Sequence, residues 1–279
     1  MKQVNVSVVL FNNEKQQVMV ALNSFLNTNL DIKIHLIDNS DADHLKVLTQ
    51  LDDRVTYLFN NGNLGFGKAH NLAIKHTIAE NIKYHIVSNP DIYFNQDVSE
   101  SIYDFMEENP DVGLVMPKVL NPDGSTQYLC KLLPSPFDVF GRRFLNWGPL
   151  KKFIDKNNWR YELRFCDYNE IMEIPYLSGC FMFLRVDALK RVGVFDERFF
   201  MYPEDIDLTR RIHRHYKTIY YPYVSVVHEH AKESYKNVRL LFIHVINLIR
   251  YFNKWGWFFD RERKAINQKT HEKLKNRRF

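Results

Sequence analysis

Two adjacent carboxylates at the start of a predicted helix are the residues best placed to do chemistry. Pro203 presets the first turn of that helix, and Glu204, Asp205 and Asp207 fall within it. The positive end of a helix dipole favours acids there, so an acidic helix start is the simplest interpretation. Residues 199–202, which lead into the turn, are nevertheless strongly aromatic. Because apolar surroundings raise the pKa of a carboxyl group toward neutrality, the Glu204–Asp205 pair is our candidate for a general base.

The elements just upstream must hold this pair in place. Residues 181–184 form a short apolar run typical of a buried strand, and residues 186–191 predict a brief helix. Gly193 can end that helix in the left-handed conformation that glycine adopts cheaply. We therefore expect a strand, a short helix and an irregular aromatic loop to precede the acidic helix.

The first 120 residues alternate between strand and helix patterns with short connections. Strands are predicted at residues 4–11, 32–37, 55–59, 84–88 and 112–116. Helices are predicted at residues 14–26, 69–78 and 98–106, with another marked by Leu45, Leu48 and Leu51. This alternation predicts an α/β fold with a doubly wound, mostly parallel sheet. In such sheets, ligands bind beyond the carboxyl ends of the strands.

Polar groups follow four of these strand ends, and we expect them to converge on one ligand. They are Asn12, the pair Asp38–Asn39, the loop at residues 60–67 and the stretch Asn89-Pro90-Asp91. Taken singly, Asp38 and the Asn-Pro-Asp stretch are also explained as turn formers after strands. The loop, however, is rich in glycine and opens a helix whose free N–H groups favour phosphate. The four positions together indicate a site for a phosphate-bearing ligand.

Two runs of spaced residues carry a resemblance to a known family. The first is Asn63-x-Gly65-Phe66-Gly67-x-Ala69-x-Asn71. The second comprises Ser178-Gly179, Arg185 and Gly193-x-Phe195-Asp196-Glu197-x-Phe199-Phe200-x-Tyr202-x-Glu204-Asp205-x-Asp207-Leu208-x-x-Arg211. Both resemble the inverting family-2 glycosyltransferases of the GT-A type, in particular their rhamnosyltransferase-like branch. The resemblance covers residues 4–230 and is firmest at 60–91 and 176–211.

The resemblance implies roles for the residues singled out above. Asp205, with Glu204 beside it in the catalytic site, would be the base that activates the acceptor, and Asp38 would contact the base of the nucleotide. The other donor-binding positions would be Asn12, Asn39, Asn63, Gly65, Phe66, Gly67, Asn71 and Asn89.

A divalent metal ion is also implied. Asp91 falls where related enzymes keep an Asp-x-Asp metal motif, but the first acid is here Asn89. Asp91 would then be the charged ligand of Mg²⁺ or Mn²⁺, because such an ion can keep several waters and bind substrate phosphates. His228 would contact the metal or the diphosphate, with a surface pair formed with His230 as the alternative.

The C-terminal part of the chain has a different character. Residues 1–236 are predicted to form the GT-A-like domain, with a nucleotide-sugar-binding half at 1–116 and an acceptor half at 117–236. Residues 130–174 show no clear period, so their fold is not predicted. Residues 237–279 are predicted to form an amphipathic helix followed by a basic tail.

The basic tail carries the charge of the whole chain. Residues 260–279 hold eight Lys/Arg and three acids, and this difference equals the formal net charge of +5. They follow an aromatic junction made of Trp255, Trp257, Phe258 and Phe259. A basic, aromatic segment is typical of contact with an anionic membrane surface, and a solvated tail is the alternative. No recognised nucleic-acid-binding motif is present, so no nucleic-acid partner is expected.

The bulk composition describes an ordinary globular protein of 279 residues, 45% of them hydrophobic. The three cysteines form no C-x-x-C pair, which favours a reducing compartment. No signal-peptide pattern and no run of about 20 apolar residues is found. We therefore predict a cytoplasmic protein at the inner face of the cell membrane.

These observations predict an inverting glycosyltransferase. It would move a sugar, with dTDP-rhamnose the donor implied by the resemblance, from a nucleotide-diphosphate donor to a hydroxyl of a glycan or lipid-linked glycan in bacterial surface polysaccharide synthesis. A non-catalytic nucleotide-sugar-binding protein of the same fold is one alternative, kept open by Asn89. A sugar nucleotidyltransferase is another, although residues 11–14 lack the glycine-rich basic loop that it requires.

Overall fold

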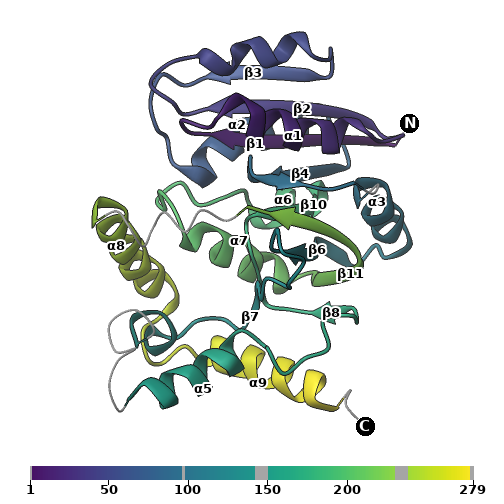
Figure 1. The fold of residues 1–279 in the computed structure, drawn as a ribbon. Coiled ribbons are helices and arrows are strands. Elements are labelled where there is room, and N and C mark those ends of the chain that lie inside the picture. The colour runs from purple at the N-terminus through teal and green to yellow at the C-terminus, as the bar shows by residue number, and fades with distance from the viewer. Residues whose placement is uncertain (1, 96–97, 142–149, 230–237, 277–279) are drawn as a thin grey trace.

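A nine-stranded sheet organises the computed structural model, which describes residues 2–95, 98–141, 150–229 and 238–276 (Figure 1). Its order is β3-β2-β1-β4-β10-β6-β11-β5, with β8 paired to β11. The strands are β1 (Gln3–Leu10), β2 (Asp31–Asp38), β3 (Val55–Phe59), β4 (Tyr84–Ser88), β5 (Ile92–Tyr93), β6 (Val112–Leu120), β8 (Met172–Glu173), β10 (Phe181–Arg185) and β11 (Lys217–His228). β1 to β4 pair in parallel, whereas β10 is antiparallel to β4 and β6. The predicted mostly parallel α/β sheet is therefore confirmed.

The helices of the first half follow the predicted alternation. They are α1 (Lys15–Leu26), the 3₁₀ helix η1 (His44–Gln50), α2 (Phe66–Ala79) and α3 (Val98–Glu108). η1 is a 3₁₀ rather than an α-helix, in keeping with its two buried residues Leu45 and Leu48 at a spacing of three. α2 begins three residues earlier than expected, because Gly65 precedes it with φ at 85° and turns the chain directly into the helix.

Arg185 at the end of β10 braces the centre of the sheet. It is 6% exposed, and its guanidinium donates to the carbonyls of Val112 and Met106 at 2.7 Å each. It also donates to the Tyr84 hydroxyl at 3.1 Å. This arginine of the family pattern is thus structural, since it ties β4, α3 and β6 together behind the short helix α6 (Val186–Val192).

The residues on both sides of Pro222 form one irregular strand, β11. Its parallel pairing with β6 shifts register between Tyr221 and Ser225, which is where Pro222 lies. Proline has no N–H to give to the ladder, so the strand bulges there and resumes toward His228. His228 therefore ends a strand, beside the two-residue strand β5.

The stretch without a clear period, residues 130–174, contains short elements. The described ones are β7 (Cys130–Lys131), the π-helical turn η2 (Phe137–Gly141), α5 (Lys151–Tyr161) and β8. β7 pairs antiparallel with β9 (Tyr176–Leu177), which brings Lys131 opposite Tyr176. This small second sheet lies directly beneath α7 (Pro203–His213), the acidic helix.

The C-terminal stretch expected to be a tail is instead mostly helix. α8 (Val238–Trp255) is followed by α9 (Arg261–Lys275), and α5 and α9 lie at the end of the molecule opposite β3 (Figure 1). Arg263, Thr270 and Leu274 are buried. Residues 261–275 of the expected basic tail are therefore helical, and the alternative of a solvated tail does not hold for them. The buried positions follow helical spacing but are largely polar, so they do not stand out as an apolar stripe.

The aromatic junction between these helices is split between interior and surface. Trp255 and Trp257 pack against a second apolar cluster that includes Leu133, Phe199 and Tyr251. In the described part of the chain, no helix is both long and apolar enough to cross a membrane.

Candidate active site

The start of α7 places the two adjacent carboxylates inside the protein. Tyr202 precedes the helix with φ at 91°, which is strained for a residue with a side chain. Pro203 occupies the first turn, as predicted. Glu204 and Asp205 are 3% and 9% exposed. The pair is thus largely removed from water.

Asp205 is held at both of its carboxylate oxygens. The backbone N–H of Gly179 donates to Oδ2 at 2.9 Å, and that of Ile206 donates to Oδ1 at 2.7 Å. The Tyr176 hydroxyl lies 3.4 Å from Oδ2. A side chain at position 179 would bring a Cβ within 3.1 Å of the Asp205 Cβ, so glycine is required for this approach.

Burial raises the pKa of both carboxyl groups, but neighbouring groups then shift the two pKa values in opposite directions. For Asp205, the hydrogen bond from Gly179 and the charge of Lys131 oppose this rise. For Glu204, the negative charge of Asp205 adds to the effect of burial. Glu204 Oε2 is moreover buried without a hydrogen-bond partner among the described residues. A proton shared by the pair therefore resides on Glu204, which leaves Asp205 as the carboxylate able to accept another.

Asp207, the third acid of this helix, does not belong to the pair. It is fully buried and accepts hydrogen bonds from Arg211 Nε at 2.8 Å and Trp255 Nε1 at 2.8 Å. Lys254 Nζ lies 2.6 Å from its Oδ1. Asp207 therefore anchors α8 on α7 and has a structural role.

The glycine-rich loop packs directly on the aromatic segment that leads to α7. The N–H of Phe66 donates to the carbonyl of Phe200 at 3.0 Å. A Cβ at Gly65 would lie 2.4 Å from that same oxygen, and one at Gly67 would lie 2.9 Å from the Cβ of Phe195. The loop and the carboxylate pair are thereby fixed relative to each other, although about 135 residues separate them in the sequence.

Asn71 joins the same two segments. Its amide donates to the carbonyl of Phe195 at 2.9 Å and accepts from the Phe195 N–H at 3.0 Å. It also donates to Glu197 Oε1 at 3.1 Å. Because both ends of this buried amide are engaged, Asn71 positions α2, and we do not carry it into the proposed donor site.

The polar residues after β2 support the loop from below. Asp38 is fully buried and accepts from the Ser40 N–H at 2.8 Å and the Tyr57 hydroxyl at 2.7 Å. A direct contact between Asp38 and a nucleotide would require these bonds to open. Asn39, also buried, donates to Asn63 Oδ1 and to the Gly65 carbonyl, each at 3.3 Å. These residues therefore hold the loop in place.

Asn12 is one of two exposed members of the predicted set, the other being Asn63. It follows β1 with φ at 54°, and its N–H donates to Ser40 Oγ at 2.8 Å. Its side chain faces solvent above the same strand ends. Asn12 and the loop are thus the predicted donor-binding positions with surface open to a ligand at this edge of the sheet.

Asp91, Asn89 and His228 meet at the ends of β4 and β11. His228 Nε2 lies 3.4 Å from Asp91 Oδ1 and 3.3 Å from Asn89 Nδ2. His228 Nδ1 lies 3.0 Å from Gln127 Oε1, so the ring orientation is fixed. The alternative given above was a surface pair of His228 and His230. Position 230 lies outside the described residues, but His228 is buried and is therefore not a surface residue.

The donor set fits a divalent ion in part. Asp91 Oδ1 is buried and accepts no hydrogen bond from a described residue, which leaves a carboxylate oxygen for a cation. In the described part of the chain, no group of three or more His, Cys, Asp and Glu is clustered for a metal. An ion at Asp91 and His228 would therefore need oxygens from the substrate.

Three residues lie at the carboxylate pair although the sequence alone assigns them no role there: Gly179, Tyr176 and Lys131. Gly179 was part of the family pattern, but its contact with Asp205 becomes evident only in the fold. Tyr176 and Lys131 meet through the pairing of β7 with β9, and Lys131 Nζ lies 5.4 Å from the Tyr176 ring. No periodicity in residues 130–174 announces this pairing.

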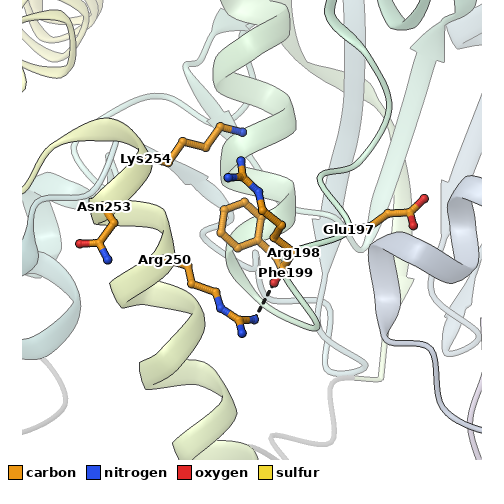
Figure 2. A pocket seen from close by; sticks show the side chains of 6 residues that line it. All are labelled: Glu197, Arg198, Phe199, Arg250, Asn253 and Lys254. Atoms are coloured by element: carbon orange, nitrogen blue, oxygen red, sulfur yellow. Dashed lines mark hydrogen bonds between the residues drawn. The ribbon is translucent and has the colours of Figure 1, made fainter.

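A separate cavity of about 590 Å³ lies between the aromatic segment and α8 (Figure 2). It is lined by Glu197, Arg198, Phe199, Arg250, Asn253 and Lys254. Its charged groups are used internally: Arg198 and Lys254 pair with Asp196, and Arg250 donates to the Arg198 carbonyl at 2.7 Å. The cavity therefore lies where residues 197–199 pack against α8, and it is separate from the carboxylate pair.

The sheet order, with the carboxylate pair and the glycine-rich loop at one edge of the sheet, is that of a GT-A glycosyltransferase fold. The chain superposes on GalNAc-T7, solved with UDP, GalNAc and Mn²⁺, with a TM-score of 0.60, covering 82% of this chain and 43% of that one. For the mannosyltransferase PcManGT of Pyrobaculum calidifontis, with GDP-Man and Mn²⁺, the TM-score is 0.56, covering 90% and 63%. Identity is 15% in both cases, so these likenesses establish the fold alone.

The chain belongs to glycosyl transferase family 2, whose model matches residues 6–193. It is 30% identical over 225 residues to the N-acetylglucosaminyl-diphospho-decaprenol L-rhamnosyltransferase of Mycobacterium tuberculosis, covering 75% of this chain and 70% of that protein. It is 24% identical over 180 residues to a low-salt glycan biosynthesis hexosyltransferase of Haloferax volcanii, covering 64% of this chain and about half of that protein. The predicted family and enzyme class, a glycosyltransferase, are confirmed.

Proposed function

We propose that the protein is an inverting glycosyltransferase in which Asp205 is the catalytic base. The observation that carries this proposal is the buried carboxylate pair, in which Asp205 accepts from two backbone N–H groups while Glu204 Oε2 has no described partner, an arrangement that favours the proton on Glu204 and the charge on Asp205. An acceptor hydroxyl at Asp205 would give up its proton as its oxygen attacks the anomeric carbon of the donor sugar. The bond from that carbon to the diphosphate breaks on the opposite face, which inverts its configuration.

The donor would be a nucleotide-diphosphate sugar held at the loop before α2. Asn12, Asn63, Gly65, Phe66 and Gly67 lie at this edge of the sheet, and the positive end of the α2 dipole would favour phosphate there, with the Phe66 N–H already bonded to the Phe200 carbonyl. Rhamnose is the sugar that the M. tuberculosis relative transfers by its name, and we propose dTDP-rhamnose as the donor.

Mg²⁺ or Mn²⁺ is proposed as the cofactor, held by Asp91 and His228 with Asn89 beside them. Asp91 Oδ1, which accepts no hydrogen bond from a described residue and lies 3.4 Å from His228 Nε2, supports this assignment, as does the Mn²⁺ present in two solved structures of the same fold. When bound, such an ion supplies positive charge for the leaving diphosphate. Asp91, His228 and Asn89 would set the position of the diphosphate, and Asp205 would face the acceptor hydroxyl.

The acceptor is proposed to be a lipid-linked glycan at the inner face of the cell membrane. The name of the M. tuberculosis relative specifies an N-acetylglucosaminyl-diphospho-decaprenol acceptor, and we propose an acceptor of this lipid-linked kind for the present protein. Lys131, which lies near the carboxylate pair on the acceptor side, would suit an acceptor that carries negative charge.

A panel of nucleotide sugars tests this function. Thermal unfolding with each sugar, with and without Mn²⁺, should show the largest stabilisation for the true donor, because a ligand stabilises by RT ln(1 + [L]/Kd). NMR of the product formed from that donor should show the inverted anomeric configuration. A product with retained configuration, or a protein that no nucleotide sugar stabilises, would contradict the proposal.

A further inference from the structure

The end of α5 and the start of α9 enclose an open groove of about 830 Å³. Arg160 comes from α5, and Phe258, Phe259, Arg261 and Lys264 come from the connection into α9 and its first turn. We call these five residues the basic groove. Phe258 and Phe259 are 77% and 96% exposed, more than any other large apolar side chain in the described part of the chain. Such exposure costs free energy in water and points to a partner that covers the rings.

The groove has an excess of uncommitted positive charge. Arg160, Arg261 and Lys264 form no ion pair with any residue that the structure describes, and all three are exposed. The acids close to them are already used: Asp260 is held by the buried Arg210 at 2.7 Å, and Glu262 by Arg210 and Arg214. Glu272, at the far side, accepts from Gln268 at 2.9 Å. The groove therefore presents a positive surface.

The two phenylalanines are presented by a fixed part of the chain. Trp257, just before them, is packed in the second apolar cluster, and Asp260, just after them, is held by Arg210. Arg263 is buried and donates to the carbonyls of Pro134 and Trp257. Because Trp257 and Asp260 are both held in place, the two residues between them are too few for the Phe258 and Phe259 rings to turn inward, and the rings stay exposed.

We infer that the basic groove is the face by which the protein docks on an anionic phospholipid bilayer. Phe258 and Phe259 would insert at the boundary between headgroups and acyl chains, where the apolar side chains of interfacial segments are buried. Arg160, Arg261 and Lys264 would meet the lipid phosphates. A bilayer fits both features at once, since it offers apolar and anionic groups side by side. The inference deepens the proposed function by naming the surface that meets the membrane, and it moves this contact from a tail to a folded groove.

Vesicle cosedimentation of the full chain tests the inference. Vesicles of phosphatidylglycerol and phosphatidylcholine in a one-to-two ratio should bind the protein at low salt, and pure phosphatidylcholine should bind it much less. Arg261→Glu with Lys264→Glu should weaken binding about tenfold or more, because each basic side chain near an anionic surface contributes about 1 kcal/mol. Phe258→Ser with Phe259→Ser should weaken binding to a similar degree and leave the salt dependence in place.

A matched control lies at the opposite end of the molecule. Lys46→Glu with Leu51→Ser changes one exposed basic residue in η1 and one exposed apolar residue just after it, beside β3, and should leave vesicle binding unchanged. Absence of binding to anionic vesicles, or equal loss in groove and control variants, would overturn the inference. So would a monomer–dimer shift on changing the phenylalanines without vesicle binding, since the groove would then bind a second protein chain.

The donor site provides a separate readout. The stabilisation of each groove variant by the nucleotide sugar should equal that of the wild type, because the groove lies away from the loop before α2. If the wild-type protein binds anionic vesicles but no nucleotide sugar stabilises it, the result counts against the proposed function alone. Normal donor stabilisation without vesicle binding would count against the groove alone.

Discussion

Asp205 keeps a usable negative charge because specific groups offset the cost of its burial. The Gly179 N–H donates a hydrogen bond to it and the positive charge of Lys131 acts on it, and both lower its pKa against the effect of burial. The outcome is a pKa of about 6, above the ordinary value of 3.8. A base with a pKa just below neutrality is ionised at working pH and still accepts a proton effectively.

The pH dependence of kcat/KM should therefore show an ascending limb near pH 6. Below this value Asp205 is protonated and cannot accept the proton of the acceptor. Lys131→Met should move the limb to higher pH, because the positive charge that favours the ionised form is removed. Lys131→Arg, which keeps the charge, should leave the limb near its original position. An unchanged profile in the methionine variant would exclude Lys131 from this role.

Glu204 should make the folded protein less stable as the pH rises. Burial first, and the charge of Asp205 second, raise its pKa from 4.5 to about 8. Below pH 4.5 the group is protonated in both states, so its contribution to stability is fully present. As the pH rises toward 8 only the unfolded state ionises readily, and the contribution is lost. Denaturant midpoints should thus fall across this window and fall less in Glu204→Gln, whereas Glu108→Gln, at an exposed site, should behave as wild type.

At the scale of elements, α9 is fastened to the helix that carries the base. Arg210 of α7 is 1% exposed and makes two bonds to Asp260, at 2.7 and 2.8 Å, while its guanidinium lies 4.0 Å from the Trp255 ring centroid. Asp260 also caps α9 by accepting from the Arg263 N–H at 2.9 Å. The C-terminal helices are therefore part of the support of α7, which carries the proposed base.

Breaking this pair should be costly. Asp260→Asn removes the buried one of the two carboxylates that pair with the Arg210 guanidinium and leaves only the partly exposed Glu262, so we expect a loss of about 3 kcal/mol in the free energy of unfolding. The double variant Arg210→Met with Asp260→Asn should recover part of that loss, since no charge remains buried. Asp187→Asn, at an exposed site, should cost about 1 kcal/mol or less in the same urea titration. A small effect of Asp260→Asn would mean that α9 is not needed to hold α7.

The elements whose residues lie close together in the sequence could be predicted, and those joined across long distances could not. The strands up to residue 116, the helix start at Pro203 and the glycine-rich loop follow local patterns. Contacts such as that of Gly65 with Phe200, or of Lys131 with Tyr176, depend on the complete sheet and leave no local signal. Likewise Asp38 fitted a ligand contact by position, but the Tyr57 hydroxyl on the neighbouring strand occupies its carboxylate.

At the scale of the whole molecule, the proposed metal position lies where the ends of β4 and β11 meet. Asp91 follows β4 and His228 ends β11, so the protein would provide one carboxylate and one imidazole, 3.4 Å apart. Calorimetry should show weak Mn²⁺ binding to the free protein and clearly tighter binding once the nucleotide sugar is present, because the diphosphate completes the coordination. Asp91→Asn should abolish the tighter phase. Strong binding without donor would contradict this two-ligand site.

The central claim is that Asp205 removes the proton from the acceptor hydroxyl, and a single-turnover measurement with Asp205→Asn tests it most directly. The variant should bind the donor like the wild type, shown by equal thermal stabilisation with the nucleotide sugar. Its rate of sugar transfer should fall by about two to four orders of magnitude, the usual contribution of a general base. Asp187→Asn should transfer sugar at the wild-type rate. If Asp205→Asn also turned over at nearly the wild-type rate, Asp205 would not be the base.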